Sequence, residues 1–210
     1  MLKQLREDIA CVKDRDPAAR SALEILFLYP GLKAIRMHRL ANRFYKKKMY
    51  FAARWISQRA SKKTGVEIHP AVQIGKRFFI DHGTGVVIGE TTVIGDDVTI
   101  YQGVTLGGTG KDTGKRHPTI GNNVMIGAGA KVLGPLNIGD NSKIASGAVV
   151  LNDIPPDSTA VGVPARVVKR EGMRVDDLDQ VHIPDPVAQE IARLENEINE
   201  LKKQIDSEGK

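Results

Sequence analysis

The sequence has little cysteine and few aromatic residues. Cys11 is the only cysteine among 210 residues, so the chain can form no internal disulfide and no metal site built from several thiolates. Aromatic residues make up 5% of the chain, whereas its 21 glycines exceed the usual share of roughly 7%. This composition speaks against a layered α/β core and favours a fold with many tight corners.

Long apolar runs are also missing. The longest, ALEILFLYPGL, is interrupted by Glu24 and Pro30 and falls short of the ~20 residues needed to cross a bilayer. The N-terminal stretch MLKQLREDIACVKDRD is charged throughout and lacks the apolar core of a signal peptide. We therefore expect a soluble, cytoplasmic protein.

Positive charge is concentrated in one segment. The net charge is +6, and residues 31–63 carry most of the excess lysine and arginine. Such a segment is compatible with binding to a nucleic acid or a membrane surface. Because no aromatic platform and no nucleic-acid-binding motif accompanies the charge, we expect a solvated helix face with no nucleic-acid or membrane partner.

Aliphatic residues recur every six positions, a spacing that neither a helix nor a simple strand with long loops produces. It predicts a solenoid in which three hexapeptides close one triangular coil, and each aliphatic side chain points inward and stacks on its equivalent in the next coil. So narrow a prism leaves no room for aromatic side chains. The runs are Ile68, Ile74 and Ile80; Ile88, Ile94, Ile100 and Leu106; and Ile120, Ile126, Val132, Ile138, Ile144 and Val150.

The six-residue spacing breaks twice, and each break contains a histidine. Two extra residues lie between Ile80 and Ile88, around the stretch DHGTG. Eight extra residues lie between Leu106 and Ile120, within GGTGKDTGKRHPT, which must form a loop that leaves the wall. Insertions in a solenoid usually lie on its binding face, so both breaks are candidate parts of a site.

The first break presents His82 beside Asp81. Gly83 and Gly85 are spaced one residue too far from the next glycine for a dinucleotide-binding loop, so we assign them to the geometry of an inserted corner. Glu67 precedes His82 by fifteen residues, slightly less than one coil of eighteen, and should lie near it, one coil below. A carboxylate that holds one ring nitrogen while the other faces a hydroxyl is the arrangement of a general base.

The second break carries Arg116 and His117. Arginine is suited to hold a carboxylate through two hydrogen bonds, and the loop is long enough to reach a neighbouring subunit. For each histidine, a purely structural hydrogen bond at a corner is the alternative. No two histidines have the spacing of five that the zinc-dependent enzymes of this repeat use, and Cys11 has no histidine near it in sequence. We expect no metal and a direct transfer between two bound substrates.

Helices are expected on both sides of the solenoid. The predicted domains are an N-terminal helical region at 1–64, with a break at Pro30 and Gly31, the solenoid at 65–169, a linker at 170–186 and a C-terminal helix at 187–210. In that last segment, apolar residues alternate in spacing between four and three, which predicts a parallel coiled coil; the alternative is a helix folded back on its own domain. The seam consists of Val187, Ile191, Leu194, Ile198, Leu201 and Ile205, with Glu197 expected to pair with Lys202 of another chain.

Several stretches together resemble the serine O-acetyltransferases, which are hexapeptide-repeat acyltransferases. They are DRDPAAR (14–20), IHPAVQIG (68–75), IDHGTGVVIGET (80–91), VTLGGTGK (104–111), KRHPTIG (115–121), MIGAGAKVLG (125–134) and GVPARVV (162–168). The resemblance implies an α+β fold with a left-handed parallel β-helix. It also implies transfer of acetyl from acetyl-CoA to the hydroxyl of L-serine, which gives O-acetylserine and CoA in the first step of cysteine synthesis.

The resemblance also assigns roles at the reacting end of serine. His82 matches the general base of the family, and Glu67 matches its partner, where many relatives have aspartate. Asp16 and Asp81 match residues that handle the ammonium and hydroxyl end of the substrate.

Further roles concern the serine carboxylate and the acetyl donor. Arg116 and His117 match residues at the carboxylate. Acetyl-CoA should lie in a groove between two prisms, lined by Gly108 and Ala128, with Lys143 as a partner of a CoA phosphate. Sites of this kind form between subunits, so the resemblance implies a homotrimer.

Two departures from the family bear on partners. The helical region before DRDPA is shorter than in relatives that pair two trimers, which favours a trimer over a hexamer. Relatives that bind O-acetylserine sulfhydrylase insert a C-terminal isoleucine, whereas this chain ends in SEGK, which argues against that complex. Two other functions stay open: acetylation of a sugar or antibiotic hydroxyl, and a non-catalytic scaffold whose basic helices bind an anionic partner.

Overall fold

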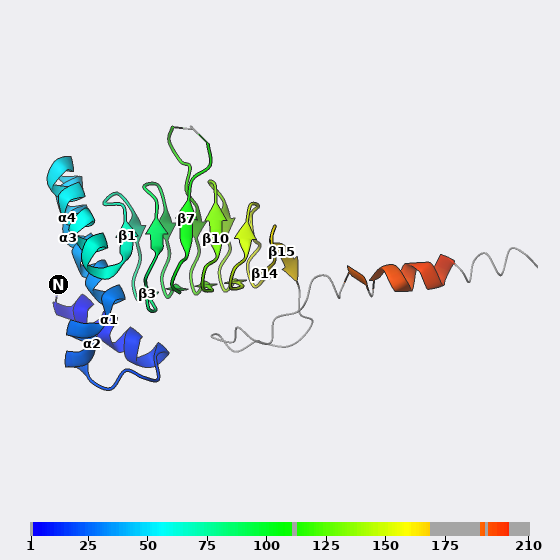
Figure 1. Cartoon of the computed structure of the whole chain (residues 1–210), viewed down its shortest axis with the longest axis horizontal. Helices are drawn as coiled ribbons and strands as arrows, with labels where there is room; N and C mark the ends of the chain where they lie inside the picture. The colour runs from blue at the N-terminus through cyan, green and yellow to red at the C-terminus, as the bar shows by residue number, and fades with distance from the viewer. Residues whose placement is uncertain (1, 111–112, 169–189, 192, 202–210) are drawn as a thin grey trace, which may run out of the picture.

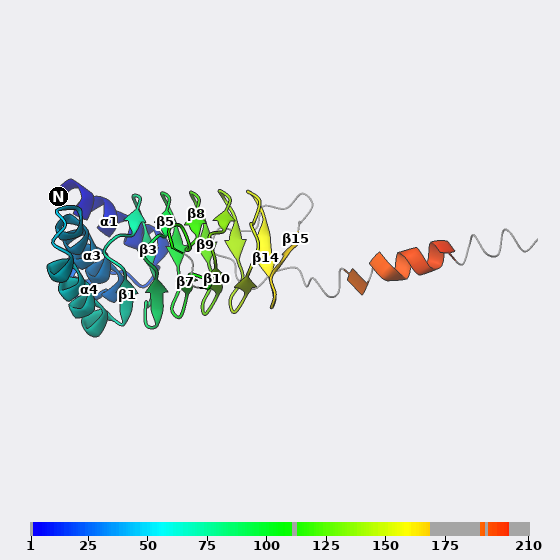
Figure 2. The same cartoon turned by 90° about the horizontal axis from the view of Figure 1, so that it is seen from above.

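Four helices precede a parallel β-helix in the computed structural model, which describes residues 2–110, 113–168, 190–191 and 193–201 (Figures 1 and 2). Residues 190–191 and 193–201 are helical. The expected fold, a parallel β-helix between an N-terminal helical region and a C-terminal helix, is confirmed. The predicted linker at 170–186 lies outside the described residues, as do Val187, Lys202 and Ile205 of the predicted seam.

The N-terminal helices are α1 (Leu2–Arg15), α2 (Ala22–Leu28), α3 (Pro30–Lys46) and α4 (Tyr50–Thr64). Ser21 begins α2, because its side chain accepts a hydrogen bond from the backbone N–H of Glu24 at 3.1 Å. Pro30 is the first residue of α3, where its missing N–H leaves no bond unmade, so the break predicted at Pro30 and Gly31 is the boundary between α2 and α3.

The strands form three sheets that face one another as the walls of the prism. The first sheet holds β1, β4, β7, β10 and β13, the second holds β2, β5, β8 and β11, and the third holds β3, β6, β9, β12, β14 and β15. The bounds are β1 (Val66–Ile68), β2 (Gln73–Ile74), β3 (Phe79–Ile80), β4 (Val86–Ile88), β5 (Val93–Ile94), β6 (Thr99–Ile100), β7 (Thr105–Gly107), β8 (Thr119–Ile120), β9 (Met125–Ile126), β10 (Lys131–Leu133), β11 (Asn137–Ile138), β12 (Lys143–Ile144), β13 (Val149–Val150), β14 (Thr159–Val161) and β15 (Arg166–Val168).

The inward aliphatic residues align from coil to coil, as the spacing predicted. In the first sheet the aligned residues are Ile68, Ile88, Leu106, Val132 and Val150. In the second they are Ile74, Ile94, Ile120 and Ile138, and in the third Ile80, Ile100, Ile126, Ile144 and Ala160. All are buried except Ile74, which is half-buried. Each fully buried Ile or Val contributes roughly 1.5–3 kcal/mol, so these columns form the core.

The expectation that no aromatic side chain fits this core is wrong at one position. Phe78 is buried and belongs to the same cluster as the columns and as Ala34 and Ile35 of α3. It lies in the first coil, where α3 rather than another coil continues the core. The contact with the helix is close, because a Cβ on Gly31 would come within 2.1 Å of the carbonyl oxygen of Ile80.

The two ends and the long loop also follow the sequence. Strand β15 pairs with β14 in antiparallel orientation and closes the far end of the stack. The loop between β7 and β8 projects from the wall (Figure 1). In the part of the chain that the structure describes, no helix is long and apolar enough to span a bilayer.

The C-terminal helix extends away from the solenoid rather than folding back along it (Figure 1). Its predicted seam residues Ile191, Leu194, Ile198 and Leu201 are 44–57% exposed. Glu197 accepts a hydrogen bond from Arg193 of the same helix. The coiled coil with other chains stays a prediction.

His38 of α3 makes the stability of the fold depend on pH. Its side chain is buried, its Nδ1 has no hydrogen-bond partner among the described residues, and burial lowers its pKa to about 4. The folded chain therefore binds no proton here at pH 5, whereas the unfolded chain does.

Above pH 6.5, His38 is neutral in both the folded and the unfolded chain and does not reduce the free energy of unfolding. We expect this free energy to fall as the pH is lowered through 6.5 toward 4. Urea unfolding at pH 7 and pH 5 measures the loss. His38→Gln, which cannot titrate, should lose less stability between these pH values. Part of the loss should persist in the variant, because burial also lowers the pKa of His69 and His117. Equal losses in the two proteins would contradict the assignment to His38.

Candidate active site

The turns between strands stack into three edges of the prism. Edge 1 collects the turns that lead from the third sheet to the first, edge 2 those from the first to the second, and edge 3 those from the second to the third. The first predicted insertion lies on edge 1, between β3 and β4. The second lies on edge 2, between β7 and β8.

His82 lies at the centre of a strained turn on edge 1. The N–H of Gly83 donates to the carbonyl oxygen of Asp81 at 2.6 Å, and His82 between them has a φ of 56°. This is a γ-turn with a positive φ at its central residue, a rare conformation for a residue other than glycine. His82 is the only described non-glycine residue on this edge with a positive φ, and its side chain is 75% exposed.

Gly83 fits this turn because a side chain would not. Its φ is 81°, and a Cβ would lie 2.8 Å from Cγ2 of Val66. Gly85, with a φ of 77°, donates its N–H to the carbonyl oxygen of Gly65 and so stacks the turn on the chain below. The assignment of both glycines to corner geometry agrees with these contacts.

Asp81 lies beside His82, and Asp16 and Tyr29 lie near Asp81. Oδ1 of Asp81 is 4.0 Å from Nε2 of His82. Burial raises the pKa of Asp81, and so does the nearby charge of Asp16, while His82 opposes the shift. Tyr29 donates a hydrogen bond of 2.5 Å to Oδ2 of Asp16, and burial together with this bond raises the pKa of Tyr29 to about 12. Asp16, just after the end of α1, thus lies close to Asp81 and His82 of edge 1, which are far from it in sequence.

Arg15 fixes the position of Asp16. Its guanidinium donates to both Oδ1 and the carbonyl oxygen of Asp97 on edge 3, each at 3.0 Å, and to the carbonyl oxygen of Arg77 at 3.1 Å. These bonds anchor the end of α1 to the solenoid one residue before Asp16. Tyr29, which lies between α2 and α3 and which the sequence analysis missed, holds the side chain of Asp16 through its hydrogen bond.

Glu67 is the middle residue of β1. Its neighbours Val66 and Ile68 are buried, so its side chain points to the outside of the first sheet, and it aligns with Val87 of β4. The described residues Glu67 and His82 form no hydrogen bond or ion pair with each other. The carboxylate that lies beside His82 is that of Asp81. The expected contact between Glu67 and His82 therefore stays a prediction.

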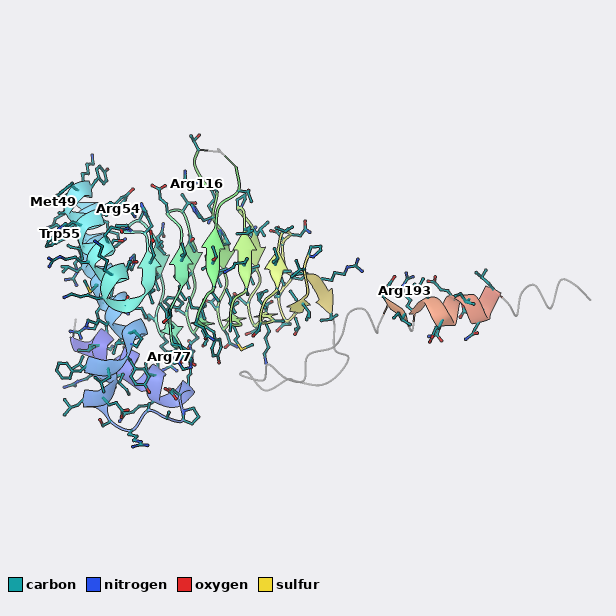
Figure 3. The ribbon with its side chains drawn as sticks, in the orientation of Figure 1. Met49, Arg54, Trp55, Arg77, Arg116 and Arg193 are labelled. Carbon is teal, nitrogen blue, oxygen red and sulfur yellow. The ribbon has the colours of Figure 1, made fainter. Side chains whose placement is uncertain are left out.

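Arg116 and His117 are held on edge 2 by two residues of the preceding coil. Oγ1 of Thr91 accepts hydrogen bonds from the backbone N–H groups of Arg116 and His117, each at 3.0 Å. The guanidinium of Arg116 pairs with Glu90 at 2.6 Å (Figure 3 shows Arg116 on the side of the long loop). Both Glu90 and Thr91 lie in the stretch GET, to which the sequence analysis gave no role.

The buried ring of His117 has a defined orientation. Its Nδ1 accepts from the N–H of Thr91 at 3.2 Å and lies 2.9 Å from Thr91 Oγ1, so the proton of the neutral ring is on Nε2. Burial lowers the pKa of His117, and the charge of Arg116 lowers it further. A Cβ on Gly108 would lie 3.3 Å from Nε2, which places this predicted cofactor-binding glycine beside His117.

Within one chain the predicted residues thus form two groups. His82, Asp16 and Asp81 are at edge 1, which also carries Ala128 in the turn between β9 and β10, and Lys143 lies on β12 of the adjoining third sheet. Gly108, Arg116 and His117 are at edge 2. The first sheet separates the two groups. Among the described residues, no group of three histidine, cysteine or acidic side chains is arranged to hold a metal ion.

Comparisons with known proteins identify the family of the chain. The family described as bacterial transferase hexapeptide (six repeats) matches residues 117–152. The serine acetyltransferase of Bacillus pumilus is 56% identical over 206 residues, which cover 98% of this chain and 95% of that protein. A soybean serine acetyltransferase complexed with serine is 46% identical, with a TM-score of 0.77 over 79% of this chain and 68% of that one. A serine acetyltransferase from Brucella abortus in complex with coenzyme A is 46% identical, with a TM-score of 0.79 over 82% and 69% of the two chains. This chain therefore belongs to the serine acetyltransferase family.

Proposed function

We propose that this chain transfers the acetyl group of acetyl-CoA to the hydroxyl of L-serine, with His82 as general base. The observation that carries the proposal is the exposed imidazole of His82 on a strained turn beside Asp81 and Asp16. Strain of this kind is concentrated at functional sites, where the surrounding structure holds it. Relatives whose structures contain serine or coenzyme A support the choice of substrates.

The proposed reaction is a direct attack. The imidazole of His82 accepts the hydroxyl proton of serine while the hydroxyl oxygen attacks the thioester carbonyl carbon. The tetrahedral intermediate then collapses, the carbon–sulfur bond breaks, and His82 returns its proton to the thiolate of CoA. In the proposal Glu67 orients the ring and stabilises the imidazolium. This requires the exposed His82 side chain to turn toward the outer face of the first sheet.

The charges on the two edges fit a zwitterionic acceptor. Asp16 and Asp81 are close enough for one carboxylate to raise the pKa of the other, and an ammonium group between them would relieve that repulsion. Arg116 and the Nε2–H of His117 are donors for a carboxylate. A sugar hydroxyl would need neither group, which favours serine over the alternative acceptor.

A site that uses both groups requires two copies of the chain. Edges 1 and 2 run along opposite sides of the first sheet. Edge 1 of one prism would therefore face edge 2 of the neighbouring prism. Repeated around a closed ring, this heterologous contact gives a homotrimer with three equal sites. Acetyl-CoA would lie in the same groove, along Ala128 and Lys143 of one copy and Gly108 of the next.

Replacing His82 by alanine should lower turnover by about 10²- to 10⁴-fold, because the general base is lost, with little change in the affinity for acetyl-CoA. Release of thiol from acetyl-CoA, measured with serine, with a panel of sugars and without acceptor, reports both the rate and the acceptor. Gln102→Ala, in the next turn of edge 1, is the matched control and should keep its rate. A His82→Ala enzyme with normal turnover would remove the residue from the base role.

Replacing Glu67 by glutamine tests the pairing with His82. A neutral amide stabilises the imidazolium less than a carboxylate does, so the rate should fall and the pKa seen in the pH profile of kcat/KM should shift downward. We expect a loss of about tenfold or more. An unaltered rate and pH profile would show that Glu67 does not act on His82.

Mixed oligomers test whether the site lies between copies. His82→Ala and Arg116→Ala proteins, each nearly inactive, are co-expressed with different tags, and oligomers that carry both tags are purified. If each site takes His82 from one copy and Arg116 from the next, every trimer that carries both tags has one intact site, so about a third of the sites in the purified trimers are active. If both residues act within one chain, the mixture shows only the sum of the two parent activities.

A further inference from the structure

The outer surface of α3 and α4, here called the end face, is strongly cationic. These two helices lie across the end of the solenoid (Figures 1 and 2). Residues 25–66, which include both helices, contain eleven lysines and arginines and neither aspartate nor glutamate. Because α3 and α4 lie across the end of the solenoid, the end face is directed along the axis of the prism, away from the strands and their edges.

Large apolar side chains are exposed on the same face. Phe51 is 86% exposed, Trp55 is 53% exposed, and Met49 and Leu40 are 49% and 46% exposed. Figure 3 shows Met49 and Trp55 at the outer margin of the helical end, away from the coils. Single exposed apolar residues are common on protein surfaces, but a group of four at one end indicates a surface that meets an apolar phase.

The helical spacing of α4 explains why these side chains face outward. Its buried residues Ala53, Ser57, Ala60 and Thr64 recur at intervals of three and four and form the side that packs on α3 and β1. Phe51 and Trp55, one turn apart, lie on the opposite side. The packing of the fold therefore does not use them.

Cationic side chains border the apolar ones. The guanidinium of Arg59 lies 4.4 Å from the centre of the Trp55 ring, and Lys46, Lys47 and Lys62 are exposed. A groove of about 480 Å³ continues from Leu40 toward α1. Its lining includes Leu5, Met37, Lys33 and Arg36. Long basic side chains around an apolar centre are typical of helices that lie in a membrane interface, where the charges stay at the headgroups.

We propose that the end face docks on an anionic phospholipid bilayer, with Phe51 and Trp55 entering the interface and the surrounding lysines and arginines contacting lipid phosphates. Each cation near such a surface is attracted to it, and tryptophan and tyrosine favour the headgroup region. A second copy of this chain fits the face poorly, because like charges would then oppose each other. A nucleic acid would leave Met49 and Leu40 unused, since neither side chain has a ring on which a base stacks. This inference replaces the solvated helix face expected from the sequence and does not depend on the proposed reaction.

The full-length protein carries its own reporter for this contact, because Trp55 is the only tryptophan in the chain. Fluorescence is recorded with vesicles of phosphatidylcholine alone and of phosphatidylcholine with phosphatidylglycerol. The expected result is a blue shift of Trp55 emission, and quenching by brominated lipid, only with the anionic vesicles. Raising the salt from about 0.1 M to about 0.5 M should weaken the shift, since the charges are then screened.

Two matched pairs of variants separate the apolar and the charged contributions. Phe51→Ser should lower partitioning into anionic vesicles by about tenfold or more, whereas Leu151→Ser, an exposed apolar residue at the other end of the solenoid, should not. Lys47→Glu with Lys62→Glu should lower it by about tenfold or more, whereas Lys13→Glu with Lys76→Glu, the same change in net charge away from the face, should have a much smaller effect. All four proteins should keep their acetyl-transfer rate.

Three results would overturn the proposal. One is an unshifted Trp55 spectrum with anionic vesicles at low salt. Another is a lack of discrimination, seen either as equal binding to neutral and anionic vesicles or as equal effects of the variants and their controls. The third is that the chain does not bind vesicles but binds RNA or an acidic protein through the end face, and that Phe51→Ser abolishes this binding.

Discussion

The structure depends on the alignment of one aliphatic side chain per hexapeptide with its equivalent in the next coil. A strand of two or three residues has too few hydrogen bonds to persist alone, so each coil is stable only when its neighbours cover it. The column from Ile68 to Val150 shows how strict the alignment is, since no position in it slips although the chain between its members varies in length. The walls are therefore fixed, and only the turns can change.

The backbone can therefore depart from the regular coil only at the edges. Ile80 and Ile88 hold the chain on either side of the two-residue insertion, and between them the backbone adopts the strained turn at His82. The rigid columns on both sides make this strain tolerable. The long loop on edge 2 is restrained differently. Thr91 of the preceding coil forms hydrogen bonds with the backbone N–H groups of Arg116 and His117 and with the ring of His117. Both edges thus present polar groups in fixed positions without any disturbance of the core.

The spacing of the sequence predicted the coils, both insertions and the histidine in each, because a period of six leaves few ways to stack the chain. It did not predict Tyr29, since the contact with Asp16 depends on how α1 and α2 dock. Arg15 of α1 fixes that docking through its bonds to Asp97 on edge 3. The position of Glu67 one coil from His82 followed from counting residues. Counting could not give the direction of the imidazole, because the inserted turn sets it. Phe78 was misjudged because the core there is continued by a helix.

The two surfaces for which we propose functions, the pair of edges 1 and 2 and the end face, point in different directions. This difference follows from the stacked columns. Edges 1 and 2 run along the prism, where a neighbouring prism can lie beside them. The end face terminates the prism, because Gly31 brings the backbone of α3 against the first coil and, among the described residues, no further layer of strands or helices covers the outer side of α4. Copies that associate side by side would hold their end faces in one plane. Binding at that plane would therefore leave the grooves between prisms open to serine and acetyl-CoA.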